Sequence, residues 1–312
     1  MKALVTGAGG FVGAVLVREL LGAGRQVHVA LRPTSPRWRL APIEEELAVH
    51  LVDLADREAV AALVRRVQPD EVFHLAAHGA YSWQTDAEQI VRSNVLGTTN
   101  LVDACVEVGC RAFVNAGSSS EYGYKPHPPS EDEALAPNSA YAAAKAFATH
   151  YCAWSAAERA LPAVTLRLYS AYGPWEEPRR LVPSLLTAAL TRRLPPLAAP
   201  DTARDFVFVQ DVAAAFTAAA RHAAGGGSGV FNIGSGTQTT LADLVETVRR
   251  LFDVPGEPEW NSLPARAWDT DVWVSQPRRA AEELGWRATT ALEAGLLATA
   301  EWLQGSEAVG VL

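Results

Sequence analysis

The chain has 312 residues, 49% of them hydrophobic, and carries a formal net charge of −8 at pH 7. This length and composition allow a large buried core, arranged as one α/β domain or as a domain with an added lobe. The acidic balance and the absence of any basic run argue against nucleic acids and anionic membranes as partners.

The apolar segments and the cysteines indicate the cellular compartment of the protein. The sequence opens directly into a strand-like segment without a charged and then apolar leader, and no apolar stretch is long enough to span a bilayer. We therefore expect a soluble, cytoplasmic protein. Cys105, Cys110 and Cys152 are odd in number and lack metal-ligand spacing with histidine, so we expect buried, reduced thiols and no metal site.

A glycine-rich turn follows the first expected strand. Residues 2–6 suit a short β-strand, the turn reads Gly7-Ala-Gly-Gly10-Phe-Val-Gly13, and an apolar helix is expected over 11–23. Gly7 permits the tight turn, Gly10 lets backbone approach a pyrophosphate, and Gly13 lets the helix pack closely on the strand. A helix N-terminus also presents free N–H groups to phosphates. The residues predicted to bind a dinucleotide here are Gly7, Gly10, Phe11, Val12 and Gly13.

The second expected strand, 26–31, should end at the adenosine ribose of such a cofactor. A carboxylate at this point would bind both ribose hydroxyls and favour NAD. Here Leu31 is followed by Arg32, with Arg37 and Arg39 close behind, and a guanidinium suits the 2′-phosphate of NADP(H). We therefore favour NADP(H) as the cofactor, with NAD(H) as the alternative. Arg32 could also be an ordinary solvated arginine.

Strand-like and helical segments alternate through the first half of the chain. Apolar strands that alternate with helices are typical of a doubly wound, parallel Rossmann-type α/β sheet covered on both faces. Such sheets bind ligands at the carboxyl ends of their strands, where the glycine turn, Arg32 and Ser118 all fall. The expected strands are 2–6, 26–31, 48–52, 71–76, 111–116 and 163–169, and the expected helices are 11–23, 56–67, 86–109 and 138–158.

The pattern changes in the second half of the chain. Proline-rich segments follow, interrupted by a helical stretch near 181–192 and a strand near 205–209. We predict a dinucleotide-binding Rossmann domain over 1–172, to which the chain returns near 205–240. The rest, mainly 173–312, is expected to form a smaller C-terminal substrate-binding lobe.

Tyr141 and Lys145 lie four residues apart on the helix expected over 138–158, so their side chains share one face. A nearby ammonium stabilises a phenolate and brings the tyrosine pKa towards the working pH, which suits proton transfer beside a hydride transfer. A hydroxyl such as that of Ser118 could then bind the reacting oxygen. The pair could equally lie on a helix surface, but the dinucleotide turn upstream favours the catalytic interpretation.

Together these motifs resemble the extended short-chain dehydrogenase/reductase family, in particular its nucleotide-sugar epimerases, dehydratases and ketoreductases. The resemblance covers essentially the whole chain and rests on many separate segments in the right order. Besides the glycine turn and the Tyr141/Lys145 pair, the matching segments are His74-Leu-Ala-Ala77, Asn94-Val-Leu-Gly-Thr98, Ser118-Ser-Ser-Glu-Tyr-Gly123, Leu168-Tyr-Ser-Ala-Tyr-Gly-Pro174, Arg204-Asp-Phe-Val-Phe-Val209, Phe231-Asn-Ile-Gly-Ser235 and Leu284-Gly-Trp286.

The resemblance implies roles for particular residues. Ser118 lies where the family has its catalytic serine or threonine, and Asp53 lies where the family contacts adenine, although it could equally cap the following turn. Arg204 and Arg266 are implied to contact the nucleotide diphosphate, which suits a guanidinium fork, and Arg204 could instead pair with Asp205. The implied cofactor-binding residues also include Leu54, Leu75, Ala76, Ala77, Tyr141 and Lys145, and the implied substrate-binding residues also include Ser119 and Ser170.

Two departures from the family pattern narrow the choice among the reactions of the family. Nucleotide-sugar enzymes of the family usually carry asparagine where this chain has Ser170, which alters the expected diphosphate site. The family's 4,6-dehydratases place a glutamate, often after an aspartate, directly after the catalytic threonine region. Here Ser119 and Ser120 stand at those positions, and Glu121 is shifted by one residue. Such a shift usually turns a side chain away, so a 4,6-dehydratase is disfavoured.

We therefore expect an enzyme that acts on a nucleotide-diphosphate sugar. The favoured reaction is reduction of an NDP-4-keto-6-deoxy-sugar by NADPH, with Tyr141 protonating the new alkoxide, because Arg32 favours NADP(H). The alternative is a 4-epimerase that oxidises C4 with a retained cofactor and returns the hydride to the other face. A non-catalytic cofactor-binding protein is disfavoured, since the tyrosine, lysine and serine are all kept. The resemblance also implies a homodimer formed by the helices at 86–109 and 138–158.

Overall fold

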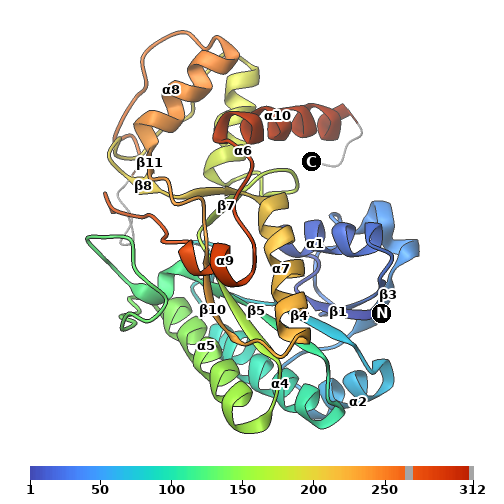
Figure 1. Cartoon of the computed structure of the whole chain (residues 1–312). Coiled ribbons are helices and arrows are strands. Elements are labelled where there is room, and N and C mark those ends of the chain that lie inside the picture. Colours follow the sequence, from blue (N-terminus) through green and yellow to red (C-terminus); the bar gives the residue numbers. More distant parts are fainter. Residues whose placement is uncertain (264–269, 309–312) are drawn as a thin grey trace.

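Seven parallel strands form one sheet through the larger part of the molecule (Figure 1). The structure is a computed structural model that describes residues 1–263 and 270–308. The sheet has the strand order β10-β6-β5-β4-β1-β2-β3, and each neighbouring pair is parallel. Its strands are β1 (Lys2–Thr6), β2 (Gln26–Leu31), β3 (Ala48–Leu51), β4 (Glu71–His74), β5 (Ala112–Ser118), β6 (Ala163–Leu168) and β10 (Gly229–Ile233).

The central strands are covered on both faces. Every residue of β4 and β5 is buried, as expected for the central strands of a parallel sheet that is covered on both faces. The six strands expected from the sequence are all present, with ends that differ by no more than two residues. The predicted Rossmann-type α/β sheet is confirmed. The seventh strand, β10, lies at one edge beside β6, although it is distant from β6 in the sequence.

Helices pack on the two faces of this sheet (Figure 1). The helices α1 (Phe11–Gly22) and α7 (Val209–Ala224) contribute buried apolar residues to one core with the strands. The helices α2 (Arg57–Val67), α4 (Gly97–Val108) and α5 (Ala140–Arg159) contribute to a second core. This two-sided cover leaves the carboxyl ends of the strands as the place where a ligand can reach the sheet.

The helix predicted over 86–109 contains a π-helical stretch. Short α3 (Ala87–Ile90) continues into η2 (Val91–Leu96), and α4 follows directly. Asn94 in this stretch is buried, and its side chain accepts a hydrogen bond from the His78 N–H and donates one to the His78 carbonyl, both at 2.8 Å. Single π-turns are frequent at functional sites. This one holds the loop that follows β4.

A smaller lobe follows β6 and occupies the upper part of Figure 1. Its helices α6 (Leu181–Leu190), α8 (Leu241–Phe252) and α10 (Leu292–Ala308) enclose a third apolar core. The chain returns from the lobe to the sheet through α7 and β10. The remaining elements are β7 (Ser170–Tyr172) paired with β9 (Phe206–Phe208), β8 (Ala203–Arg204) paired with β11 (Thr239–Thr240), η1 (Ala41–Glu46), η3 (Ser119–Tyr122) and α9 (Arg278–Glu283).

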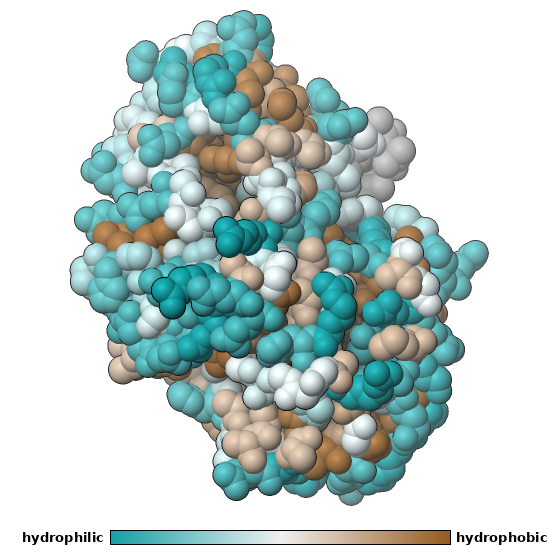
Figure 2. Space-filling view, in the orientation of Figure 1, coloured by the Kyte–Doolittle hydropathy of each residue, from teal (hydrophilic) through white to brown (hydrophobic). Residues whose placement is uncertain are grey.

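The surface is mainly polar. Hydrophilic residues cover most of the face shown in Figure 2, and apolar residues gather towards its lower end, where Figure 1 shows α4 and α5. Within residues 1–263 and 270–308, no helix combines the length and the apolar composition needed to cross a membrane.

The close packing of α1 on the preceding turn makes Gly13 sensitive to substitution. A methyl group added at Gly13 would lie 2.3 Å from the carbonyl oxygen of Gly7, far inside van der Waals contact. Because α1 would have to shift, we expect Gly13→Ala to lower the free energy of unfolding by about 1–3 kcal/mol. Dinucleotide binding should weaken as well. Urea denaturation and cofactor titration would measure the two effects.

Gly22→Ala is the matched control, because nothing lies within 4 Å of a methyl group added at the other end of α1. Alanine is favoured over glycine in a helix by up to about 1 kcal/mol, so this variant should be at least as stable as the wild type. An equal loss of stability in both variants would contradict the steric explanation.

Candidate active site

The glycine turn between β1 and α1 leaves no room for side chains. Gly7 has a φ of +71°, and a β-carbon added there would lie 2.5 Å from the backbone nitrogen of Ala76. Gly10 precedes α1 without a side-chain cap, and the first helical turn has no acidic residue. Its free N–H groups and the positive end of the helix dipole fit the pyrophosphate of a dinucleotide. Phe11, Val12 and Gly13 form the first turn of α1, and Leu75, Ala76 and Ala77 follow β4 beside Gly7.

The three arginines after β2 have different surroundings. Arg37 forms an ion pair of 2.9 Å with Glu44, and Arg39 is buried, with its guanidinium donating to two backbone carbonyl groups. Arg32 has no ion pair within the part of the chain that the structure describes. Desolvation lowers the pKa of His78, and the charge of Arg32 lowers it further, so Arg32 lies on the side of the loop after β4. Of the three, Arg32 could face a cofactor phosphate.

Asp53 and Leu54 follow β3 at the same end of the sheet. The Asp53 carboxylate accepts a hydrogen bond from the Ala55 N–H at 3.0 Å and pairs with Arg92 at 3.4 Å. Its alternative role as a cap of the following turn is therefore confirmed, and a contact with adenine stays a prediction. Leu54 is buried, and its carbonyl accepts a hydrogen bond from Asn100 at 2.9 Å.

The structure brings Ser118, at the end of β5, to Tyr141, near the start of α5. Burial raises the pKa of Tyr141 to about 12, and a hydrogen bond with Ser118 opposes that rise. Glu121 adds to the rise, and the positive charge of Arg180 lowers the pKa. A phenol with this pKa is protonated at neutral pH, so in the ligand-free protein Tyr141 is set as a proton donor.

Lys145 lies one helical turn after Tyr141 and is almost fully buried. Burial lowers the pKa of Lys145 to about 8, although the negative charge of Glu121 opposes this shift. Burial, and then the charge of Lys145, lower the pKa of His74 to about 3, so His74 is neutral. The buried surroundings of Lys145 therefore favour its neutral form over the charged ammonium.

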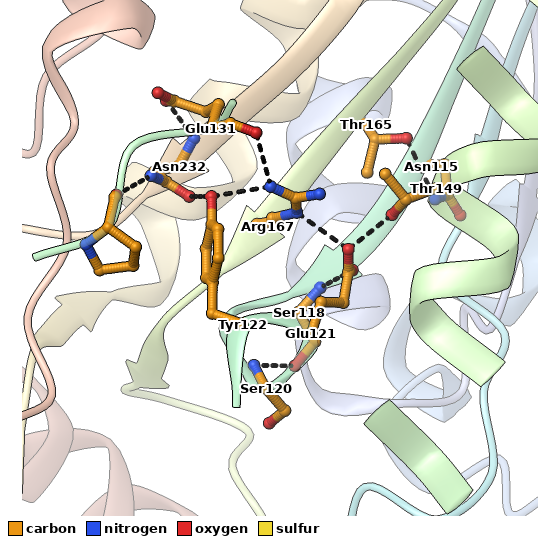
Figure 3. A network of polar contacts seen from close by, with 11 residues as sticks. Asn115, Ser118, Ser120, Glu121, Tyr122, Glu131, Thr149, Thr165, Arg167 and Asn232 are labelled. Atoms are coloured by element: carbon orange, nitrogen blue, oxygen red, sulfur yellow. Dashed lines mark hydrogen bonds and ion pairs between the residues drawn. The ribbon is translucent and has the colours of Figure 1, made fainter. Parts of the chain in front are cut away.

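Glu121 is fully buried, and both of its carboxylate oxygens are engaged (Figure 3). One oxygen accepts a hydrogen bond from the Ser118 N–H at 2.7 Å. The other accepts from the Thr149 hydroxyl and from the Arg167 guanidinium, both at 2.9 Å. Glu121 is thus turned into the protein, as the one-residue shift predicts, and has no free oxygen for proton abstraction.

The network continues from Arg167 to the edge of the sheet (Figure 3). Arg167 donates to the Tyr122 hydroxyl at 2.8 Å and to the Glu131 carbonyl at 3.1 Å, and Tyr122 donates to Asn232 on β10 at 2.8 Å. This network was not predicted from the sequence. The available signal was an arginine inside an otherwise uncharged strand, because a buried arginine requires a partner.

One loop over the site comes from the carboxyl end of β4. A β-carbon added to Gly79 would lie 3.3 Å from the Tyr141 β-carbon, so this loop packs directly against the tyrosine. Tyr81 and Trp83 from the same loop stack with their ring centroids 4.7 Å apart.

A second loop, which follows β7, meets the first through two arginines. The Arg179 guanidinium lies 4.0 Å from the centroid of the Trp83 ring, and that of Arg180 lies 5.9 Å from the Tyr81 ring. Cation–π contacts of this kind contribute about 0.5–1 kcal/mol each at exposed sites. We call the two loops, residues 78–84 and 174–180, the roof of the site. Trp175 packs elsewhere, under Arg18 and beside Trp302.

The expected substrate-binding residues lie along the border between the sheet and the smaller lobe. Ser119 opens η3, and Ser170 opens β7, where its N–H donates to the Asp205 carbonyl at 3.0 Å. Arg204 lies on β8 with its guanidinium 5.8 Å from a tryptophan ring, and the carboxylate of Asp205 accepts hydrogen bonds from two serines of the lobe. Arg266 lies outside the described residues.

A cavity of about 150 Å³ lies away from these residues, between α5, β6 and β10, and includes neither Ser118 nor Tyr141. A smaller one, about 20 Å³, opens beside Ser119 and Lys125, on the side of the expected substrate. Among the described residues, no group of three or more histidine, cysteine or acidic side chains could hold a metal ion.

Comparisons with known proteins agree with this arrangement. The sequence profile of the NAD dependent epimerase/dehydratase family matches residues 3–234. The UDP-glucose 4-epimerase of Mycolicibacterium smegmatis is 32% identical, over 97% of this chain and 99% of that protein. A dTDP-glucose 4,6-dehydratase of Escherichia coli is 28% identical, over 97% of this chain and 92% of that protein.

Solved structures show the same fold. The structures of MoeE5 in complex with UDP-glucose and NAD, and with UDP-glucuronic acid and NAD, are 31% and 32% identical in sequence. In each case the TM-score is 0.84, with 98% of this chain and 100% of the other covered. The glycine turn, the β5 serine and the α5 tyrosine–lysine pair therefore lie on a scaffold that holds a nicotinamide dinucleotide and a nucleotide sugar in related proteins.

The burial of Lys145 predicts a gain in stability when its charge is removed. The pKa of Lys145 is about 8 in the folded protein, against 10.5 for an unperturbed lysine. The unfolded chain therefore binds more protons between these values, and keeping Lys145 charged at neutral pH costs the folded state on the order of 3 kcal/mol. We expect Lys145→Met to lose activity but to be more stable than the wild type at neutral pH.

The pH dependence of stability supplies the control. The stability advantage of Lys145→Met over the wild type should shrink as the pH rises above about 8, because the lysine of the folded wild type then loses its proton. Urea denaturation near pH 7 and near pH 9.5 would measure it. A variant that is less stable at neutral pH, or whose advantage is the same at both pH values, would refute this account.

Proposed function

Since the chain belongs to the NAD dependent epimerase/dehydratase family, we propose that it is a 4-epimerase of a nucleotide-diphosphate sugar, which it oxidises and re-reduces at C4. The observation that carries the proposal is that Ser118, at the carboxyl end of β5, acts on Tyr141 near the start of α5, with Lys145 one turn further along that helix. The identity of 32% to a UDP-glucose 4-epimerase over nearly the whole chain supports this choice among the family's reactions.

The three side chains divide the proton transfer between them. The Ser118 hydroxyl would hold the C4 oxygen, and Tyr141 would take the proton of the C4 hydroxyl and later return it. A nicotinamide dinucleotide at the glycine turn would supply a hydride acceptor and donor for C4. The charge of Arg180 favours the phenolate form of Tyr141 against the burial that raises its pKa. Inversion at C4 requires the keto-sugar to turn over between the two proton transfers.

The same geometry disfavours a 4,6-dehydratase, despite the relatives with that activity. Elimination of water requires a base that removes the C5 proton. Glu121 is the carboxylate nearest in sequence to the expected position, and its oxygens are already bound by Ser118, Thr149 and Arg167. Ser119 and Ser120 carry no carboxylate.

A 4-ketoreductase of an NDP-4-keto-6-deoxy-sugar is the second candidate, and Arg32 is the observation that favours it. Its guanidinium lies after β2 without an ion pair among the described residues, which suits the 2′-phosphate of an exchangeable NADPH. In that reaction Tyr141 would donate its proton once to the new alkoxide, which agrees with its raised pKa. The two candidates use the same side chains and differ in whether the cofactor is retained.

The proposed function divides the chain into two parts. Residues 1–172, with the return segment near 205–240, would bind the dinucleotide, and most of 173–312 would bind the nucleotide sugar. Within the second part, Arg204 suits the diphosphate because a guanidinium fork matches two phosphate oxygens. Ser119, Ser170 and Arg266 would complete the substrate contacts.

A homodimer formed through α4 and α5 belongs to the same proposal. The side chains of Val91, Leu96, Phe147 and Trp154 are large, apolar and 38–49% exposed on η2 and α5. Apolar residues grouped on neighbouring helices mark a surface suited to burial against another chain. Pairing with a second copy of the same helices would cover them.

Tyr141→Phe tests the chemistry of the site. Removing the hydroxyl removes the proton donor and acceptor, so we expect interconversion of UDP-glucose and UDP-galactose to fall by about 10²–10⁴-fold. Tyr151→Phe is the control, because Tyr151 lies on the same helix and its hydroxyl bonds Asp103 at 2.8 Å. Full activity in the Tyr141 variant would support a non-catalytic role instead.

The identity and amount of cofactor released when the same protein preparations are denatured distinguish the epimerase from the ketoreductase. Retained, stoichiometric dinucleotide and turnover without added cofactor would support the epimerase. Little retained cofactor, together with NADPH-dependent reduction of a 4-keto-6-deoxy sugar nucleotide, would support the ketoreductase and overturn the first choice.

Arg32→Ser tests whether Arg32 recognises the 2′-phosphate on the adenosine ribose of the cofactor. Loss of a guanidinium–phosphate interaction should weaken NADP(H) binding about tenfold or more and leave the affinity for NAD(H) unchanged. Fluorescence titration with both cofactors would measure the difference, with Arg37→Ser as control because Arg37 already pairs with Glu44. An equal effect of Arg32→Ser on both cofactors would show that Arg32 does not recognise the 2′-phosphate.

A further inference from the structure

The second roof loop contains a buried acid with an open oxygen. Glu176 is 5% exposed, and its Oε2 atom has no hydrogen-bond partner within the described part of the chain. Its Oε1 atom lies 3.5 Å from the Arg180 Nε, at the outer limit of a hydrogen bond. A buried acceptor without a partner costs about 1–3 kcal/mol, so a ligand is the natural source of the missing donor.

A buried cation with an open donor lies in the same cluster. Arg39 is 4% exposed and uses Nε and Nη1 to hold the carbonyl groups of Trp175 and Gly9. Its Nη2 atom is 3.7 Å from the Glu177 carboxylate, too far for a hydrogen bond, and has no other partner in the described residues. The charges of Glu176 and Arg39 act on each other, and Glu177, next to Glu176 in the chain, lies 3.7 Å from Arg39.

The cluster adjoins the reacting end of the site. Burial raises the pKa of Tyr81; Arg39 and Arg180 lower it, and Glu176 contributes to the rise. The Arg180 guanidinium lies 5.9 Å from the Tyr81 ring, and the charges of Arg180 and Tyr81 in turn act on Tyr141. The loop that carries Tyr81 also packs on Tyr141 through Gly79, so a sugar whose C4 oxygen reaches Tyr141 would lie beside the loop that Arg180 contacts.

We propose that Glu176 is a specificity-determining residue of the sugar pocket, whose carboxyl group accepts a hydrogen bond from a neutral sugar and disfavours a uronic acid. The inference rests on the proposed function, because it concerns the sugar that this function would use. Both classes of sugar are compatible with the fold, since MoeE5 is seen with UDP-glucose and with UDP-glucuronic acid. A sugar hydroxyl supplies the missing donor, whereas a sugar carboxylate brings a second negative charge to a buried acid.

Ionisation of Glu176 makes this discrimination depend on pH. Burial raises the pKa of Glu176 to about 7, while Arg180, the backbone of Gly173 and Arg39 lower it. The other charged or titratable groups of the cluster are Tyr81, from the loop after β4, and Glu177, next in the chain. A uronate would bind best when Glu176 is protonated. Its dissociation constant should therefore rise about tenfold per pH unit above the pKa and level off below it, whereas that of a neutral sugar should not.

Calorimetric titration of the full chain in the presence of NAD tests this directly. UDP-glucose and UDP-glucuronate share every group except the one at C6, so the ratio of their dissociation constants isolates the effect of the carboxylate. In the wild type we expect UDP-glucose to bind at least tenfold more tightly near pH 8.5, and the preference to shrink steadily towards about pH 6.

Glu176→Gln keeps the size of the side chain and removes its charge. We expect this variant to bind UDP-glucuronate at least tenfold more tightly than the wild type near pH 8.5, with a ratio that no longer varies with pH. Glu246→Gln is the matched control, since Glu246 is exposed on α8 and pairs with Arg249 at 3.0 Å. Circular dichroism establishes that each variant is folded, and the wild-type pH series tests the proposal without any variant.

The possible outcomes distinguish a failure of the role proposed for Glu176 from a failure of the proposed function. Equal affinity of the wild type for the two sugars near pH 8.5, tighter binding of the uronate, or an unchanged ratio in folded Glu176→Gln would overturn the role of Glu176 while leaving the proposed function intact. Binding of neither nucleotide sugar would overturn the proposed function, and this inference with it.

Discussion

The ion pair between Glu121 and Arg167 holds together the elements that form the candidate site (Figure 3). Both side chains are almost completely buried, and each keeps further hydrogen bonds, which a buried pair needs in order to offset its loss of hydration. Glu121 binds the backbone of Ser118 on β5 and the Thr149 hydroxyl on α5, and Arg167 extends from β6 through Tyr122 towards β10. Removing one partner of such a pair typically costs about 3–5 kcal/mol, so the position of Ser118 depends on contacts well outside the site.

Burial also determines the chemistry that the site can perform. It raises the pKa of Tyr141 and lowers that of Lys145, so both groups are shifted towards their neutral forms. Perturbed groups of this kind cluster where proton transfer is needed, because a donor or acceptor works best near its own pKa. In the same buried surroundings, Glu121 forms an ion pair with Arg167. The Glu121 carboxylate thereby becomes structural, because its oxygens are bound by Ser118, Thr149 and Arg167.

The sheet and the smaller lobe meet at a seam of buried charge. Arg39 reaches from the segment after β2 to the carbonyl groups of Gly9 and Trp175, so one side chain connects the glycine turn to the second roof loop. Glu176 and Arg180 continue this seam towards Tyr141. The glycine turn and the second roof loop are therefore connected through one set of charges, so a substitution in one should affect the other.

The sequence by itself determined the local features: the strands and helices, the glycine turn, and the placement of Tyr141 and Lys145 on one helical face. Periodicity, glycine stereochemistry and the spacing of four residues act within a few residues of the chain, so they can be read without a structure. Only the tertiary structure decided which side chains are buried and with what they pair. Asp53 caps its own turn, Glu121 binds Arg167 from another strand, and the seam of buried charge joins three loops. These outcomes depend on segments that are distant in the chain, where burial sets the energy of each charge.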